Sequence, residues 1–262
     1  MKEDNKLSDL TITLSCNNNC VFCPRDILSL ILHDRKSSKF KDQLKKIRAQ
    51  SDSINLTGGE ITVLPDIFDI FKICKELGFK KISIITNARM ASYKKYAEKL
   101  SRYVNSAGVS VYSIDKNVHD KISRVSGSLK QTLQGLKNLL DNIEHIWVNI
   151  TVSRINSSTL ARTMKDLYEI GVREFLIISV ISENKDYIYN KNVIREEFNK
   201  INKATLKESL ITLRGFDQES TQDIGNSREK EIRIEDHAFN TFYSEENNEN
   251  YYKHLDGILN EN

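Results

Sequence analysis

The chain has 262 residues, of which 39% are hydrophobic and 29% charged, and its formal net charge is +3, as in ordinary globular proteins. No apolar run reaches the roughly eighteen residues of a membrane span, and residues 1–6 are too polar for a secretory signal. Because three of the four cysteines are clustered, we expect a reducing, cytoplasmic environment and no disulfide framework.

The charge is unevenly distributed along the chain. Residues 217–262 hold 12 of the 36 acidic and 4 of the 39 basic residues, so the body before them is strongly basic. A basic body is compatible with a phosphate-bearing or nucleic-acid substrate. Lysine-rich, solvated helix faces explain the same composition more simply.

Predicted strands and helices alternate along the chain. The strands are predicted at residues 10–14, 54–56, 81–85, 108–114, 146–152 and 175–181. Helices are predicted at residues 40–50, 66–77, 93–104, 128–140, with Ser128 as N-cap, and 160–170. A charged helix at 192–206, an apolar run at 210–213 and a polar tail follow.

Six strand–helix repeats predict a parallel sheet with helices outside it, because parallel strands need crossover connections. An open Rossmann-type sheet and a barrel both fit this alternation. The predicted core covers residues 1–215. Residues 216–262 are expected to form an extension that serves as a lid or an arm, or that is partly disordered.

Three cysteines, Cys16, Cys20 and Cys23, lie within eight residues after the first strand and directly before Pro24. An odd number of thiols on one short loop points to metal ligation. Thiolates select zinc or iron–sulfur iron, and no Cys or His close behind supplies the fourth ligand of a structural zinc site. Cys74 lies on the apolar face of its helix and is predicted to be a buried core residue.

The CxxxCxxC spacing, with Phe22 before the third cysteine, resembles the signature of the radical S-adenosylmethionine (radical SAM) superfamily. The segment Thr57-Gly58-Gly59-Glu60, after the second strand, resembles its second element. The resemblance implies a 4Fe-4S cluster on Cys16, Cys20 and Cys23, with SAM on the fourth iron. It also implies reductive cleavage of SAM to a 5'-deoxyadenosyl radical that abstracts hydrogen from a substrate.

The same resemblance favours a partial TIM-like (β/α)6 barrel, whose site lies at the C-terminal ends of the strands. It implies that Phe22 contacts the adenine of SAM, whereas a core role is the alternative. It further implies that Gly58, Gly59 and Glu60 receive SAM, with the carboxylate available to the ammonium group. A plain structural turn is the alternative for the two glycines.

The segment after the fourth strand resembles one in peptide-modifying enzymes and molybdenum-cofactor cyclases of this superfamily. There a Ser and an Arg touch the ribose or carboxylate of SAM, and Ser113 and Arg124 match them. The usual Gly-Pro is replaced by Lys116-Asn117, and a surface ion pair is the alternative for Arg124. Thr86-Asn87 resembles the Thr-Asn-Gly of the family, with Ala88 in place of Gly.

His119, His145, His237 and His254 show no metal-ligand spacing, and His119 is predicted to lie in the loop after the fourth strand. No cysteine follows Cys74, which favours a compact member with one cluster. The resemblance therefore predicts an enzyme that acts on a peptide or small molecule and takes electrons from a donor such as flavodoxin or ferredoxin. The alternatives are a non-catalytic iron–sulfur or zinc-binding sensor or scaffold, and an RNA-modifying radical enzyme.

Overall fold

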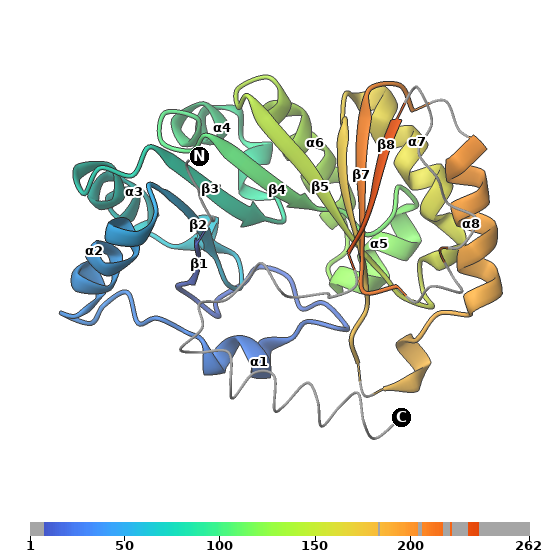
Figure 1. Ribbon diagram of the computed structural model, residues 1–262, viewed down its shortest axis with the longest axis horizontal. Helices are drawn as coiled ribbons and strands as arrows, with labels where there is room; N and C mark the ends of the chain where they lie inside the picture. The colour runs from blue at the N-terminus through green and yellow to red at the C-terminus, as the bar shows by residue number, and fades with distance from the viewer. Residues whose placement is uncertain (1–7, 183, 204–205, 217–220, 222–229, 236–262) are drawn as a thin grey trace.

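The computed structural model describes residues 8–182, 184–203, 206–216, 221 and 230–235. Within them, eight strands form one parallel sheet, and their order in the sheet is their order in the chain (Figure 1). The strands are β1 (Ser8–Thr11), β2 (Ser53–Thr57), β3 (Lys81–Thr86), β4 (Ser106–Ser110), β5 (His145–Val152), β6 (Glu174–Ser179), β7 (Ser209–Arg214) and β8 (Lys230–Glu235).

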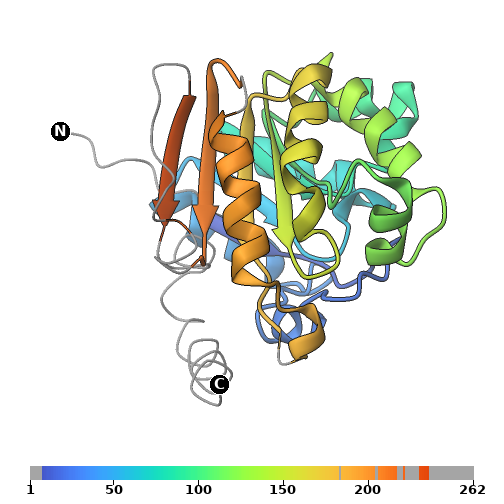
Figure 2. The same cartoon turned by 90° about the vertical axis from the view of Figure 1, so that its right-hand side faces the viewer.

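Helices connect successive strands from β1 to β7 and cover the outer face of the sheet. They are α2 (Phe40–Gln50), α3 (Ile67–Glu76), α4 (Lys94–Leu100), α5 (Lys116–Ser123), α6 (Ser128–Leu140), α7 (Leu160–Ile170) and α8 (Lys191–Lys203). A short helix, α1 (Arg25–Leu30), lies apart from them, below β1 and β2 in Figure 1. Figure 2 shows α8 packed beside β7 at one end of the sheet. None of the described helices has the length and hydropathy of a bilayer span.

The two faces of the sheet differ in polarity because successive side chains of a strand point to opposite sides. One register row contains Leu10, Leu56, Ile84, Ala107 and Ile146, and each is at most 6% exposed in the core under the outer helices. The neighbouring row points to the inner face and is polar: Asp9, Asn55, Ser83, Ser106 and His145. The apolar side of the sheet therefore packs against the helices, and polar strand residues lie on the inner face.

The predicted fold class is confirmed: the parallel sheet is open, as in a partial TIM-like barrel. It continues beyond the six predicted strands, because the apolar run at 210–213 forms β7 and a segment inside the expected extension forms β8. Cys74 is fully buried, as predicted, and burial raises the pKa of its thiol to about 12.

The segment after β4 departs from the prediction. The strand ends at Ser110 rather than at residue 114, and residues 116–123 form the helix α5. His119 is therefore a buried helical residue and not part of a loop. The prediction that Ser128 caps α6 is wrong: the N-cap is Gly127, and Ser128 is the first residue of the helix. The carboxylate of Asp120 accepts hydrogen bonds from the Gly127 and Leu129 N–H groups and so caps α6 from α5.

Candidate active site

A cavity of about 270 Å³ opens at the C-terminal ends of the strands. Its wall is built from the cysteine loop (residues 16–24), the turn after β2, and the ends of β3, β4, β5 and β6. The structure thus brings together most of the residues singled out in the sequence. Those in the wall are Cys16, Cys20, Phe22, Cys23, Gly58, Gly59 and Glu60.

Ser113 and Arg124 do not line this cavity. Ser113 is fully buried, and its Oγ lies 3.0 Å from Thr159 Oγ1 and 3.5 Å from Thr163 Oγ1. Alternation along the chain from Ser110, which lines the cavity, places Ser113 on the opposite side, and its side chain faces α7. Arg124 is exposed in the left-handed conformation that ends α5, with φ of 55°. Their predicted contacts with SAM find no support in these positions.

The cysteine loop rests on the C-terminal end of α5. The N–H of Asn19 donates to the carbonyl of Ser123 at 3.0 Å, and the N–H of Val21 donates to that of Ile122 at 2.9 Å. These carbonyls belong to the last turn of a helix, where they lack partners within the helix. Backbone pairing therefore fixes the middle of the loop without using the cysteine side chains.

The loop after β3 holds the start of the cysteine loop. Asn87 Nδ2 donates to Asn17 Oδ1 at 2.7 Å. The guanidinium of Arg89 donates to the Asn17 carbonyl and, at 2.8 Å, to Asn18 Oδ1, while its Nε donates to Gln131 Oε1 on α6 at 2.7 Å. Arg89 thus ties the cysteine loop to a helix, a role that no local sequence pattern indicates.

Two of the three sulfurs, those of Cys16 and Cys20, lie within hydrogen-bond distance of donors. Cys16 Sγ accepts from the N–H of Asn18 at 3.3 Å, and Cys20 Sγ lies 3.2 Å from the hydroxyl of Tyr112. All three thiols are free of disulfides, and burial raises the pKa of Cys20 to about 11. Among the described residues, no three His, Cys, Asp or Glu side chains have the spacing to hold one metal ion. A cluster does not need that spacing, because each cysteine binds a different iron.

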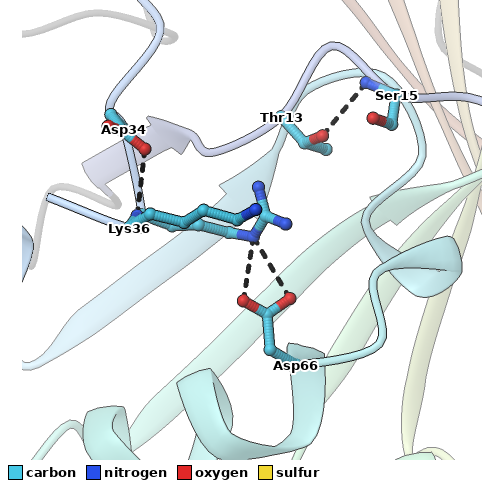
Figure 3. A network of polar contacts seen from close by, with 6 residues as sticks. Thr13, Ser15, Asp34, Lys36 and Asp66 are labelled. Atoms are coloured by element: carbon cyan, nitrogen blue, oxygen red, sulfur yellow. Dashed lines mark hydrogen bonds and ion pairs between the residues drawn. The ribbon is translucent and has the colours of Figure 1, made fainter.

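Gly58 and Gly59 are required by close contact within the chain. A Cβ on Gly58 would lie 2.3 Å from the carbonyl oxygen of Thr13, and one on Gly59 would lie 2.4 Å from that of Ser15. Gly58 also has φ of 141°, which side chains rarely permit. The N–H of Gly59 donates to the Thr13 carbonyl at 2.7 Å. Figure 3 shows the adjoining turn, where Ser15 N–H donates to Thr13 Oγ1 at 3.0 Å. The glycines therefore bring the turn after β2 against the entry to the cysteine loop.

Glu60 is a buried carboxylate that reaches from the turn after β2 to the end of β3. Its Oε1 accepts from Thr62 Oγ1 at 2.6 Å and from Thr86 Oγ1 at 2.8 Å, and its Oε2 accepts from the N–H of Asn87 at 2.5 Å. Burial raises the pKa of this carboxyl, and the surrounding hydrogen bonds oppose the shift. The carboxylate is rigidly placed at the cavity wall, where a cationic ligand would stabilise its charge.

Several wall residues were missed in the sequence. Tyr112 lies beyond the end of β4, and Asn149 and Thr151 belong to β5. Ser110, the last residue of β4, pairs with Asn149 in the sheet register. Alternate residues of a strand share a face, so once one β5 residue is known to point inward, the rule identifies both Asn149 and Thr151. The same rule, applied to the predicted strand at residues 108–114, places Tyr112 on the face of Ser110 and would have found it too.

The model of the Radical SAM superfamily matches residues 10–167 of the chain. A probable GTP 3',8-cyclase from Saccharolobus islandicus is 28% identical over 218 residues, which cover 78% of this chain and 68% of the relative. One from Sulfurisphaera tokodaii is 29% identical over 183 residues, covering 66% of this chain and 56% of the relative.

Solved structures share the fold. Streptococcus suis SuiB, bound to its precursor peptide SuiA, superimposes with a TM-score of 0.59 at 17% identity. That match covers 88% of this chain and 49% of SuiB, so the chain spans about half the length of SuiB. The structure of anSMEcpe with bound AdoMet gives a TM-score of 0.60 at 15% identity, over 74% of this chain and 59% of that one.

Proposed function

Because the chain belongs to the radical SAM superfamily of enzymes, we propose that Cys16, Cys20 and Cys23 hold a 4Fe-4S cluster and that the adjoining cavity binds SAM. The observation that carries the proposal is the meeting of three disulfide-free cysteines with the Gly58-Gly59-Glu60 turn in one cavity wall. The donor set fits the cluster, since soft thiolates bind iron–sulfur iron. Cys16 Sγ already accepts an N–H hydrogen bond, as a ligand thiolate does.

Such a cluster, when bound, supplies the electron that cleaves SAM to methionine and a 5'-deoxyadenosyl radical, which abstracts a hydrogen atom from the substrate. The electron comes from an external one-electron donor such as flavodoxin or ferredoxin. The chain contributes rigid placement of its residues, through the hydrogen bonds that fix the cysteine loop on α5 and on Arg89.

Glu60 is proposed to bind the ammonium group of SAM. Three neighbouring residues, Thr62, Thr86 and Asn87, hold the carboxylate in place. Among the described residues, Oε2 accepts one hydrogen bond, from the N–H of Asn87, so it has a further lone pair for a cation. Phe22 lies in the same wall and is proposed to contact the adenine.

The substrate is proposed to enter beside the ends of β4, β5 and β6. There the wall carries neutral polar groups, Ser110, Asn149, Thr151 and Ser179, next to apolar Ile178. Trp147 Nε1 donates to Asn149 Oδ1 at 2.9 Å, which leaves the Asn149 amide N–H groups as donors. Such a surface suits an uncharged, hydrogen-bonding group of a peptide or small molecule.

Cyclisation of GTP is the second candidate, and the named relatives from Saccharolobus and Sulfurisphaera favour it. A triphosphate would need cationic partners. Among the described residues that line the cavity, none is Lys or Arg. The proposed substrate is therefore a neutral group, and GTP is the compound to test beside it.

The test is anaerobic reconstitution with iron and sulfide, followed by dithionite and SAM, with 5'-deoxyadenosine measured by mass spectrometry. The expected result is 5'-deoxyadenosine from the wild type and none from a variant with all three loop cysteines changed to Ala. Reactions with GTP and with short neutral peptides compare the two substrate classes. A protein that binds four irons and SAM yet never cleaves it, with or without these compounds, would support the sensor or scaffold alternative.

A further inference from the structure

The hydroxyl of Tyr112 lies 3.2 Å from Cys20 Sγ, although the two residues are 92 positions apart in the sequence. Both line the same cavity. Either atom of the pair could donate while Cys20 is a thiol. A thiolate has no proton to donate, so in the ligand form of Cys20 the phenol must be the donor. The contact is therefore an O–H···S hydrogen bond to a proposed cluster ligand.

The backbone of Tyr112 is fixed on both sides. Its N–H donates to Nδ1 of the buried His119 at 3.3 Å, and its carbonyl accepts from Asn156 Nδ2 at 2.8 Å. Asn156 also donates to the carbonyl of Thr151 at 2.9 Å, which ties this segment to the end of β5. These bonds hold the segment beyond β4 at a defined distance from the cysteine loop.

The ring of Tyr112 is packed between two others. Phe22 meets it edge to face with ring centroids 5.5 Å apart, and His119 lies tilted against it at 5.3 Å. Phe22 belongs to the cysteine loop itself, so the ring and the loop position each other. This packing therefore fixes the direction of the Tyr112 hydroxyl before any ligand binds. A hydrogen bond that alters the properties of a cluster ligand requires such fixed geometry.

Cys16 and Cys20 obtain their donors from different places. Cys16 accepts from the N–H of Asn18, within the loop, and from Asn87 Nδ2, beyond β3, at 4.0 Å, whereas Cys20 is paired with the Tyr112 hydroxyl, beyond β4. Hydrogen bonds to cluster sulfurs are among the main determinants of reduction potential. A donor draws negative charge from the thiolate and so stabilises the reduced cluster, which carries one more negative charge.

We propose that Tyr112 is a positioning residue that raises the reduction potential of the cluster through its hydrogen bond to Cys20. The proposal rests on the proposed function, because it requires that Cys20 be a cluster ligand. Its consequence is that the cluster accepts an electron from a weaker reductant than it would without the phenol. A side chain absent from the cysteine motif thereby sets how readily the enzyme is activated.

The test is a redox titration of the reconstituted full chain, in which the EPR signal of the reduced cluster is measured at each potential. Tyr112→Phe removes the hydroxyl and keeps the ring, so its midpoint potential should be more negative than that of the wild type. Tyr103→Phe is the matched control, because Tyr103 packs against Phe71 at a centroid distance of 6.0 Å, away from the cavity. Its potential should equal that of the wild type.

A second variant keeps the test decisive if Tyr112→Phe assembles no cluster. Incorporation of 3-fluorotyrosine at position 112 retains the ring and hydroxyl but makes the phenol a stronger donor, so the potential should become more positive. If Tyr112→Phe and 3-fluorotyrosine at position 112 both leave the midpoint potential at the wild-type value, the role of Tyr112 is overturned and the proposed function stands. Failure of the wild type itself to assemble a cluster would instead overturn the proposed function.

Discussion

Gly135 and Ala88 are in direct contact: a Cβ added to Gly135 would lie 1.9 Å from the carbonyl oxygen of Ala88. Ala88 itself has φ of 58°, in the left-handed region. From the same helix, Thr132 Oγ1 donates to the carbonyl of Asn87 at 2.9 Å. Asn87 in turn donates to Glu60, so an outer helix determines where groups at the cavity wall stand.

Gly135→Ala should lower the free energy of unfolding by about 2 kcal/mol, because the added methyl meets backbone that cannot move aside. This loss outweighs the gain in helix propensity, which is about 1 kcal/mol. Urea denaturation measures the difference. Lys137→Ala, on the exposed side of α6, is the control and should change stability by less than about 0.5 kcal/mol. Unchanged or higher stability in Gly135→Ala would contradict the contact.

Changing Cys16, Cys20 or Cys23 singly to Ala should abolish the visible absorbance of the reconstituted cluster, because each thiolate would bind a separate iron. Cys74→Ala should keep that absorbance and lower the free energy of unfolding by about 1 kcal/mol, since it removes a buried sulfur from the core. Iron and sulfide analysis checks the first result, and urea denaturation the second. Loss of the cluster in the Cys74 variant would show that this thiol is not merely a core residue.

Glu60→Gln should weaken SAM binding about tenfold or more while iron content stays unchanged, because the charge that meets the ammonium group is lost. Calorimetry on the cluster-loaded protein measures the affinity. Thr86→Val is the matched control: it removes a donor to Glu60 Oε1 but keeps the carboxylate. Equal losses in both variants would mean that the effect arises from the shape of the site and not from the charge of Glu60.

Arg89→Met should release the cluster to an iron chelator several-fold faster than the wild type does, because the cysteine loop loses its bonds at Asn17 and Asn18. Gln131→Ala removes only the partner of the Arg89 Nε and should have a smaller effect. The rate is followed by the decay of cluster absorbance under anaerobic conditions. Identical rates in wild type and Arg89→Met would exclude a role for this side chain in holding the loop.

Asp9 should make stability depend on pH. Burial raises its pKa from 3.8 to about 7, with the Asn55 hydrogen bond and the charge of Arg214 opposing the shift. Between these values folded Asp9 binds more protons than unfolded Asp9, so this group contributes stability that is lost as pH rises, by at most about 1.4 kcal/mol per pH unit. Asp9→Asn cannot titrate, so its unfolding free energy should fall less, or rise more, with pH than that of the wild type over this range. Parallel pH profiles from urea denaturation of the two proteins would refute the assignment.

Local patterns were enough to predict the core of the architecture and most of the proposed site residues. The alternation of strand and helix patterns predicted the parallel α/β sheet. These patterns could be recognised because each one involves only residues that are close together in the sequence. The cysteine spacing and the Gly58-Gly59-Glu60 turn predicted which segments would line the cavity, since the ends of parallel strands meet at one edge of the sheet. The burial of Cys74 followed in the same way from its place on an apolar helix face.

Only the tertiary structure decided which side chains outside these motifs reach the cysteine loop. Ser113 faces α7, while Tyr112 meets Cys20 across 92 positions of sequence. Arg89 binds Asn17 across 72 positions of sequence. Such contacts depend on how segments far apart in the sequence pack together, and that packing is set by the free energy of the whole core and not by local sequence.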